Sequence, residues 1–98
     1  MLLDGLYSVL ESSNDEVSVL LSDASHPVFQ AHFPLNPILP GFVHLEIISD
    51  VFNLEIKGVK KAKYMELVLP SQKVKYIKNA NKIVATCNNK DVASFSLV

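Results

Sequence analysis

His32 and Glu46 are the two side chains of this sequence whose types and surroundings best suit acid–base chemistry. His32 lies in HFPLNPILPG, where three prolines restrict the backbone, and a restricted backbone can hold a general base in a fixed position. Glu46 lies among apolar residues, with Asp50 one turn further along an expected helix and on the same face. A carboxyl group that is buried beside a second negative charge retains its proton, as a general acid must.

Simpler roles for these residues stay open on the sequence alone. A histidine in a loop is most often only a hydrogen-bonded loop residue, and Glu46 and Asp50 could instead lie on a narrow stripe that faces solvent.

The start of the expected helix adds a third element. Gly41 and the residues after it present backbone N–H groups, and such groups can bind an oxyanion.

The other candidates for chemistry have structural interpretations. His44 lies two positions before Glu46 and points to a different side of a helix, where packing or an interface is the expected role. His26, in the proline-rich loop, is interpreted as structural. Cys87 follows a strand-like pattern and is expected to be a small core residue. The spacing of His26, His32 and Cys87 matches no standard zinc site, so we predict no metal.

The elements that must position these side chains follow from the hydrophobic pattern. Residues 2–12 have mixed periodicity and predict either a strand or a short helix, whereas residues 16–22 alternate as a strand does. Residues 23–40 hold four prolines and predict a loop. The apolar residues of 41–56 surround the helical wheel, which predicts a helix buried on every side. Three or four strands are expected after it, over 58–69, 73–78, 82–87 and 91–98.

This order of elements predicts an α+β fold, with one domain over residues 1–98, in which an antiparallel sheet wraps around a central helix. One small sheet covers only one side of that helix. The chain is also 49% hydrophobic, whereas a domain of this size buries only about 60–65% of its unfolded surface. A partner chain that covers the remaining apolar surface is therefore expected.

The charged residues are distributed unevenly. All nine lysines follow residue 56, whereas eight of the ten acidic residues precede it. The simpler interpretation is that folding mixes the two halves, and the alternative is a basic face that binds an acidic partner. Nucleic acid is not expected, because the chain has no arginine and few aromatic residues among its lysines. No secretory leader or long apolar span stands out, so we expect a cytoplasmic location without membrane insertion.

The segment HPVFQAHFPLNPILPGFVHLE resembles the signature of the bacterial 3-hydroxyacyl-acyl-carrier-protein dehydratases of the FabZ/FabA type, which are hotdog-fold enzymes. The family pattern runs F-x-G-H-F-P-G-x-P-x-x-P-G, with an acidic residue five positions after the last glycine. A second segment, KAKYMELVLPSQKV (61–74), resembles the family's later strand and turn. The positions that fall on the first pattern in register are Phe29, His32, Phe33, Pro34, Pro37, Pro40, Gly41 and Glu46.

The resemblance implies a homodimer whose sheets join edge to edge, with two composite sites at the interface. In each site, His32 of one subunit removes a proton from C2 of a 3-hydroxyacyl thioester, and Glu46 of the other protonates the departing 3-hydroxyl group. The product is a trans-2-enoyl thioester of fatty-acid, related lipid or polyene synthesis. The positions that the resemblance implies for binding the thioester carbonyl and the substrate are Gly41, Phe42, Phe33 and Pro40.

The resemblance implies no metal or redox cofactor, since the substrate is carried on the phosphopantetheine of an acidic acyl carrier protein. Three departures from the family pattern put the substrate in question. Leu35 and Ala31 replace glycines, and Asp50 stands where FabZ-like members tend to have glutamine. The alternatives are a hotdog thioesterase and a non-catalytic acyl-thioester-binding homologue. Candidate residues for docking the carrier protein are Lys57, Lys60, Lys61 and Lys63.

Overall fold

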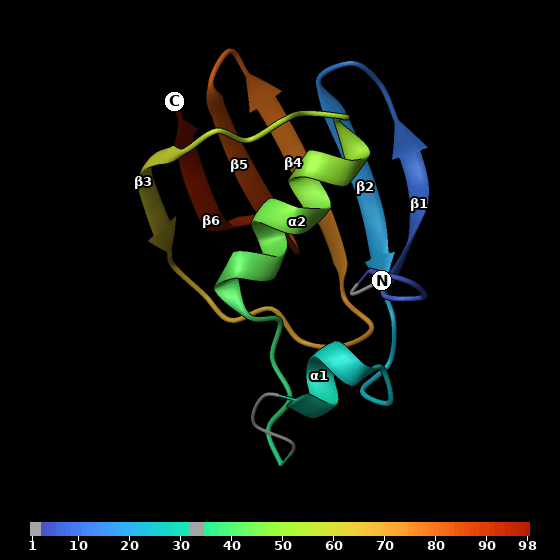
Figure 1. The fold of residues 1–98 in the computed structure, drawn as a ribbon. Coiled ribbons are helices and arrows are strands. Elements are labelled where there is room, and N and C mark those ends of the chain that lie inside the picture. Colours follow the sequence, from blue (N-terminus) through green and yellow to red (C-terminus); the bar gives the residue numbers. More distant parts are fainter. Residues whose placement is uncertain (1–2, 32–34) are drawn as a thin grey trace.

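The computed structural model describes residues 3–31 and 35–98. In this part of the chain, the strands form one antiparallel sheet in the order β1-β2-β4-β5-β6-β3, and helix α2 lies across one face of it (Figure 1). The predicted α+β architecture, an antiparallel sheet around a central helix, is therefore confirmed. The elements are β1 (Tyr7–Ser12), β2 (Glu16–Leu21), α1 (Pro27–Ala31), α2 (Gly41–Val51), β3 (Val59–Tyr64), β4 (Lys73–Asn79), β5 (Lys82–Cys87) and β6 (Lys90–Leu97).

Strands β4 and β5 follow the alternation of the sequence, whereas every residue of β3 is exposed. In β4, Val74 and Tyr76 are buried toward α2, while Lys73 and Lys75 are exposed on the outer face. The hairpin between β5 and β6 turns at Asn88–Asn89, where both residues have positive φ, at 53° and 64°. Asparagine tolerates this left-handed conformation better than most residues, which explains the turn at this position.

Helix α2 is shorter than the predicted helix over 41–56. It ends at Val51, and Asn53 then takes a left-handed conformation with φ 51°. Leu54 N–H donates to the Ser49 carbonyl at 3.0 Å, and Asn53 N–H donates to the Asp50 carbonyl at 3.3 Å. These two bonds form a Schellman motif, which stops the helix although the apolar pattern continues beyond it.

The prediction that this helix is buried on every side is wrong for one chain. The side of α2 that packs on the sheet carries Val43, His44, Ile47 and Ile48, all of them buried. The opposite side is open to solvent. A single six-stranded sheet covers one face of a helix and leaves the other without a neighbour.

The predicted loop over 23–40 contains a short helix, α1, which the sequence analysis missed. Proline is tolerated as the first residue of a helix, because its missing N–H has no acceptor there in any case, and Pro27 takes that position. The His26 side chain caps the helix, since its Nδ1 accepts the N–H of Val28 at 3.0 Å. Its Nε2 therefore carries the proton and donates to the Asp4 carbonyl at 2.7 Å. The structural role predicted for His26 is confirmed.

Replacement of His26 by alanine is expected to lower the free energy of unfolding by about 1–2 kcal/mol, because both the cap and the link to the N-terminal turn are lost. His26→Asn keeps a capping side chain and should recover part of this loss. Urea unfolding of the two variants beside the parent chain measures the difference. Equal stability of the parent and His26→Ala would show that these two bonds contribute nothing net.

In the part of the chain that the structure describes, neither helix is long and apolar enough to cross a membrane.

Candidate active site

The segment that carries His32 leads directly into α2. His32, Phe33 and Pro34 lie outside the described residues, so the predicted role of His32 stays a prediction. The chain after them is anchored, because the N–H of Leu39 donates to the Val68 carbonyl at 2.7 Å. This bond joins the proline-rich segment to the segment between β3 and β4.

An apolar groove of about 680 Å³ lies between these two segments. Leu35 lines this groove and is 94% exposed in the single chain, and its predicted influence on the substrate stays a prediction. The groove begins directly after His32 in the sequence and is suited to an apolar ligand or partner. Its apolar lining residues are Leu35, Pro37, Ile38, Leu67, Leu69 and Pro70.

The start of α2 is not capped by any side chain. Pro40 takes the N-cap position with an extended backbone, at φ −61° and ψ 141°, and Gly41 is the first helical residue. The Val43 N–H bonds back to the Pro40 carbonyl at 3.0 Å. An uncapped helix start carries partial positive charge and exposes N–H groups, which suits an oxyanion.

Tyr64, at the end of β3, lies across this helix start and was missed by the sequence analysis. A Cβ atom placed on Gly41 would lie 2.7 Å from Cε1 and Cζ of Tyr64 and 3.0 Å from its hydroxyl oxygen. Glycine is therefore required at position 41 for this ring to lie where it does. The ring packs edge to face on Phe95, with centroids 5.7 Å apart, while 53% of the Tyr64 side chain stays exposed.

Replacement of Gly41 by alanine is expected to destabilise the fold by about 1–3 kcal/mol, because the new methyl group displaces the Tyr64 ring from its packing on Phe95. The same substitution in a Tyr64→Ala background should cost much less. A double-mutant cycle of unfolding free energies measures this coupling. Additive effects of the two substitutions would show that the ring and the glycine do not constrain each other.

The exposed side of α2 carries Phe42, Glu46 and Asp50, at intervals of four residues. Phe42 is 52% exposed and lies next to the helix start. The burial expected for Glu46 is thus wrong for one chain, and the alternative of a stripe facing solvent describes the single chain correctly. A second chain on this face would be needed to desolvate the carboxyl group.

Asp50 is held by a residue that the sequence analysis did not single out. The hydroxyl group of Tyr7, on β1, donates a hydrogen bond to the Asp50 carboxylate. Burial, followed by this bond and the negative charge of Asp50, raises the pKa of Tyr7. Because Asp50 is engaged with β1, its carboxylate has a structural partner, whereas Glu46 has none among residues 3–31 and 35–98.

His44 lies on the buried side of α2, as the spacing from Glu46 predicted. Its Nδ1 is joined by a 2.8 Å hydrogen bond to the hydroxyl group of Tyr76, on β4. Burial lowers the pKa of His44 to about 4, so the imidazole is neutral at physiological pH. It also packs against Phe95 at a centroid distance of 6.0 Å. His44 is therefore a core residue, and so is Cys87, which is buried as predicted.

The lysines proposed for docking a carrier protein lie along one edge of the sheet. Lys60, Lys61 and Lys63 belong to β3, every residue of which is exposed, and Lys57 precedes it, also exposed. Gly41, Phe42 and Glu46 lie on α2, with Tyr64 beside Gly41, and Tyr64 belongs to β3 together with Lys60, Lys61 and Lys63. The sequence signal for Tyr64 was its place in the KAKYMELVLP segment, whereas no sequence signal pointed to Tyr7.

A family model described as ApeI-like, ApeI dehydratase, matches residues 10–96. A 3-hydroxyacyl-[acyl-carrier-protein] dehydratase FabZ from Thermotoga neapolitana is 30% identical over 105 aligned positions, which cover 95% of this chain and 74% of the relative. A FabZ from a Thermoanaerobacter species is 30% identical over 63 positions, which cover 64% of this chain. The matched part spans only 44% of that second relative, less than half of its length.

Solved structures show the same fold at low sequence identity. A chain of the dehydratase heterocomplex ApeI:P from Xenorhabdus doucetiae superimposes with a TM-score of 0.67 at 14% identity, covering 92% of this chain and 91% of the other. Mouse thioesterase superfamily member 2 superimposes with a TM-score of 0.59 at 12% identity, covering 97% and 80% of the two chains. The fold is therefore the hotdog fold, which dehydratases and thioesterases share.

Proposed function

Because the chain belongs to the ApeI-like dehydratase family, we propose that it removes water from a 3-hydroxyacyl thioester to give a trans-2-enoyl thioester. The observation that carries the proposal is the position of Glu46. It lies on the exposed side of α2, just beyond a helix start that no side chain caps and that begins with Gly41, next to the Tyr64 ring. This position supports the proposal, because Glu46 as the proton donor and the helix start as the oxyanion-binding site would lie on one rigid element.

In the proposed reaction, the thioester carbonyl oxygen accepts a hydrogen bond from the Gly41 N–H. His32 takes the proton from C2, and the carbonyl group stabilises the negative charge that develops there. The electron pair then forms the C2–C3 double bond, and the C3–O bond breaks. The Glu46 carboxyl group gives its proton to the departing hydroxyl group, so that water leaves.

A second hotdog chain is part of this proposal, because Glu46 is exposed in one chain whereas a general acid needs a partly desolvated site. The simplest second chain is another copy, with His32 and Glu46 of each site supplied by different subunits. The apolar groove beside Leu35 would receive the acyl chain. The phosphopantetheine of an acyl carrier protein would hold the substrate, and Lys57 and the lysines of β3 would contact that protein.

The FabZ relatives point to fatty-acid synthesis, and the ApeI-like family model leaves room for a more specialised lipid or polyene pathway. A cytoplasmic location would be consistent with either pathway and stays a prediction. We expect substitutions that distinguish this chain from the FabZ/FabA pattern to alter its choice of substrate. These substitutions are at Leu35, Ala31 and Asp50.

The test is to incubate the purified protein with 3-hydroxyacyl and trans-2-enoyl thioesters of several chain lengths, on a carrier protein and on coenzyme A. Mass spectrometry distinguishes loss or gain of water from release of the acid. We expect interconversion of the two thioesters with no release of free thiol. Release of thiol without interconversion would identify a thioesterase, and a folded protein that binds the thioesters without converting them would identify a non-catalytic homologue.

A further inference from the structure

Tyr64 differs from the other two tyrosines of the chain in the state of its hydroxyl group. Tyr7 donates its hydroxyl to Asp50, and the hydroxyl of Tyr76 is joined to His44 at 2.8 Å. The Tyr64 hydroxyl forms no hydrogen bond within the described part of the chain, although its ring is packed. A ring that only fills space needs no hydroxyl group, so this donor is a candidate for contact with a ligand.

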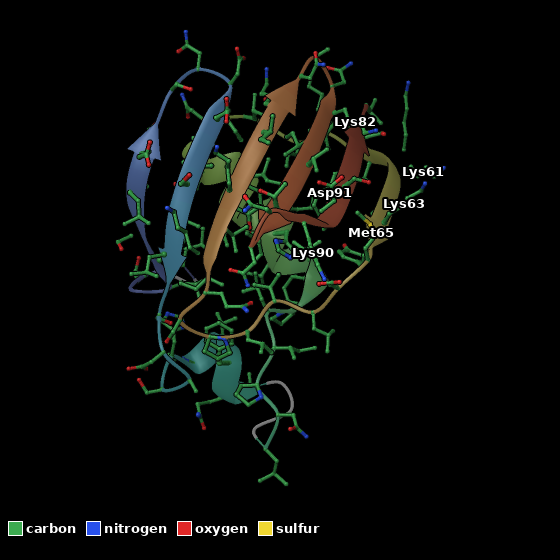
Figure 2. All side chains as sticks on the ribbon, turned by 180° about the vertical axis from the view of Figure 1, so that it is seen from behind. Lys61, Lys63, Met65, Lys82, Lys90 and Asp91 are labelled. Carbon is green, nitrogen blue, oxygen red and sulfur yellow. The ribbon has the colours of Figure 1, made fainter. Side chains whose placement is uncertain are left out.

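Strand β3 presents the Tyr64 ring to the start of α2. Side chains alternate between the two faces of a strand, and Lys61 and Lys63 extend on the outer face of the sheet (Figure 2). Tyr64 therefore points to the face that α2 covers. Pairing of β3 with β6 fixes its backbone, and packing of the ring on Phe95, at a centroid distance of 5.7 Å, fixes the side chain.

The hydroxyl group lies close to the first N–H of α2. A Cβ atom placed on Gly41 would lie 3.0 Å from the Tyr64 hydroxyl oxygen. Because the nitrogen and Cβ of one residue are about 2.5 Å apart, this oxygen lies at most about 5.5 Å from the Gly41 nitrogen. Two donors that share one acceptor oxygen at about 2.9 Å each are at most about 5.8 Å apart. The two groups are thus close enough to bind the same oxygen atom.

Both donors also lie on the same side of the helix start. The Cα–Cβ bonds of a helix tilt toward its N-terminus, and its first N–H groups point out of that end. A hydroxyl group that contacts the Cβ position of Gly41 therefore lies on the side to which the N–H is directed. In the described chain the Gly41 N–H has no hydrogen-bond acceptor. Tyr64 is 53% exposed, so a ligand can reach both groups.

We propose that the Tyr64 hydroxyl group donates a second hydrogen bond to the thioester carbonyl oxygen, beside the bond from the Gly41 N–H. This inference rests on the proposed function, which supplies the carbonyl group. When His32 takes the C2 proton, the electron pair of the broken C–H bond is delocalised onto this oxygen. Tyr64 keeps its own proton and stabilises the negative charge through the hydrogen bond alone. A donor that is fixed before the reaction needs no reorganisation during it.

The Tyr64→Phe variant removes only the hydroxyl group and keeps the ring on Gly41 and Phe95. A donor to a charge that develops in the transition state acts on the rate more than on substrate binding. We expect kcat to fall about 10²-fold, as for the loss of one oxyanion donor, while KM changes by less than about threefold. The free energy of unfolding should equal that of the parent, because the hydroxyl has no partner in the described chain.

Ser94→Ala is the matched control for loss of a hydroxyl group. Ser94 lies on β6, opposite Lys63 of β3, and it precedes the buried Phe95, so its side chain points to the outer face of the sheet. The variant alters the strand beside Tyr64 without altering the helix start. It should retain the kcat of the parent.

A spectroscopic measurement separates a direct hydrogen bond from a structural effect. The probe is a saturated acyl-pantetheine thioester labelled with carbon-13 at its carbonyl group and used at several chain lengths. It has neither a 3-hydroxyl group nor a double bond, so it does not react. A hydrogen bond lowers the infrared stretching frequency of a carbonyl group. We expect a lower frequency for the probe bound to the parent or to Ser94→Ala than for the probe bound to Tyr64→Phe.

The inference is overturned if Tyr64→Phe keeps the parent kcat, if Ser94→Ala loses as much, or if the carbonyl frequency is the same on the parent and on Tyr64→Phe. Any of these results with an active parent leaves the proposed reaction intact. A parent that shows the frequency difference but converts no 3-hydroxyacyl thioester loses the proposed reaction, while the contact with Tyr64 stands. A parent that binds no thioester loses both.

Discussion

The Glu46→Gln variant is expected to interconvert 3-hydroxyacyl and trans-2-enoyl thioesters about 10²–10⁴-fold more slowly than the parent, with an unchanged free energy of unfolding. Glutamine keeps the shape of the side chain and removes the proton that the departing hydroxyl group requires. Stability should not change, because Glu46 is exposed on α2 and none of the hydrogen bonds or ion pairs found in the described chain involves its side chain. Single-turnover rates and urea unfolding measure the two quantities separately.

Glu55→Gln is the control for loss of one negative charge, since Glu55 is exposed beyond the end of α2. It should retain the parent rate. A Glu46→Gln protein with full activity would remove Glu46 from the mechanism even if the dehydration itself is established. A slow Glu46→Gln protein that is also partly unfolded would point to a structural role instead.

The largest expected effect on stability concerns His44. Burial holds its folded-state pKa at about 4, below the ordinary value of 6.5, so the unfolded chain binds a proton in this range that the folded chain does not bind. The contribution of the neutral His44 to the free energy of unfolding is therefore fully present above pH 6.5 and is lost as the pH falls toward 4. The total loss is about 3 kcal/mol, of which about 2 kcal/mol should appear between pH 7 and pH 5.

Urea unfolding at a series of pH values between 7 and 5 measures this dependence. The His44→Phe/Tyr76→Phe variant removes both members of the buried hydrogen bond, so no unpaired polar group is left in the core. Its unfolding free energy should vary much less over this range. If the double variant shows the same slope as the parent, groups other than His44 cause the dependence.

Much of the fold could be predicted from the pattern of apolar residues. The alternation of β4 and the asparagines at positions 88 and 89 determine a strand and a turn through local chemistry alone. The end of α2 was missed because Leu54 and Ile56 continue the apolar pattern, while the stop signal is the single residue Asn53. Helix α1 was missed because the prolines of residues 23–40 predict a loop, although proline at a helix start favours the helix.

Only those parts of the candidate site could be predicted whose residues lie close together in the sequence. Gly41 and Glu46 lie within one helix, and their spacing fixes their relation. Tyr64 lies next to Gly41 only because β3 packs against the start of α2. Tyr7 reaches Asp50 from the opposite edge of the sheet. The exposure of Glu46 depends on the number of chains in the assembly, which no local pattern specifies.

The most direct measurement mixes two inactive proteins, His32→Ala and Glu46→Gln, after mild denaturation and refolding together. Random pairing makes half of the dimers mixed. If each site takes His32 from one chain and Glu46 from the other, one of the two sites in every mixed dimer is intact. The mixture should then recover about one quarter of the parent rate, whereas each variant alone stays about 10²–10⁴-fold below it. A mixture that remains as slow as the two separate variants, although native mass spectrometry shows mixed dimers, would contradict a site shared between chains.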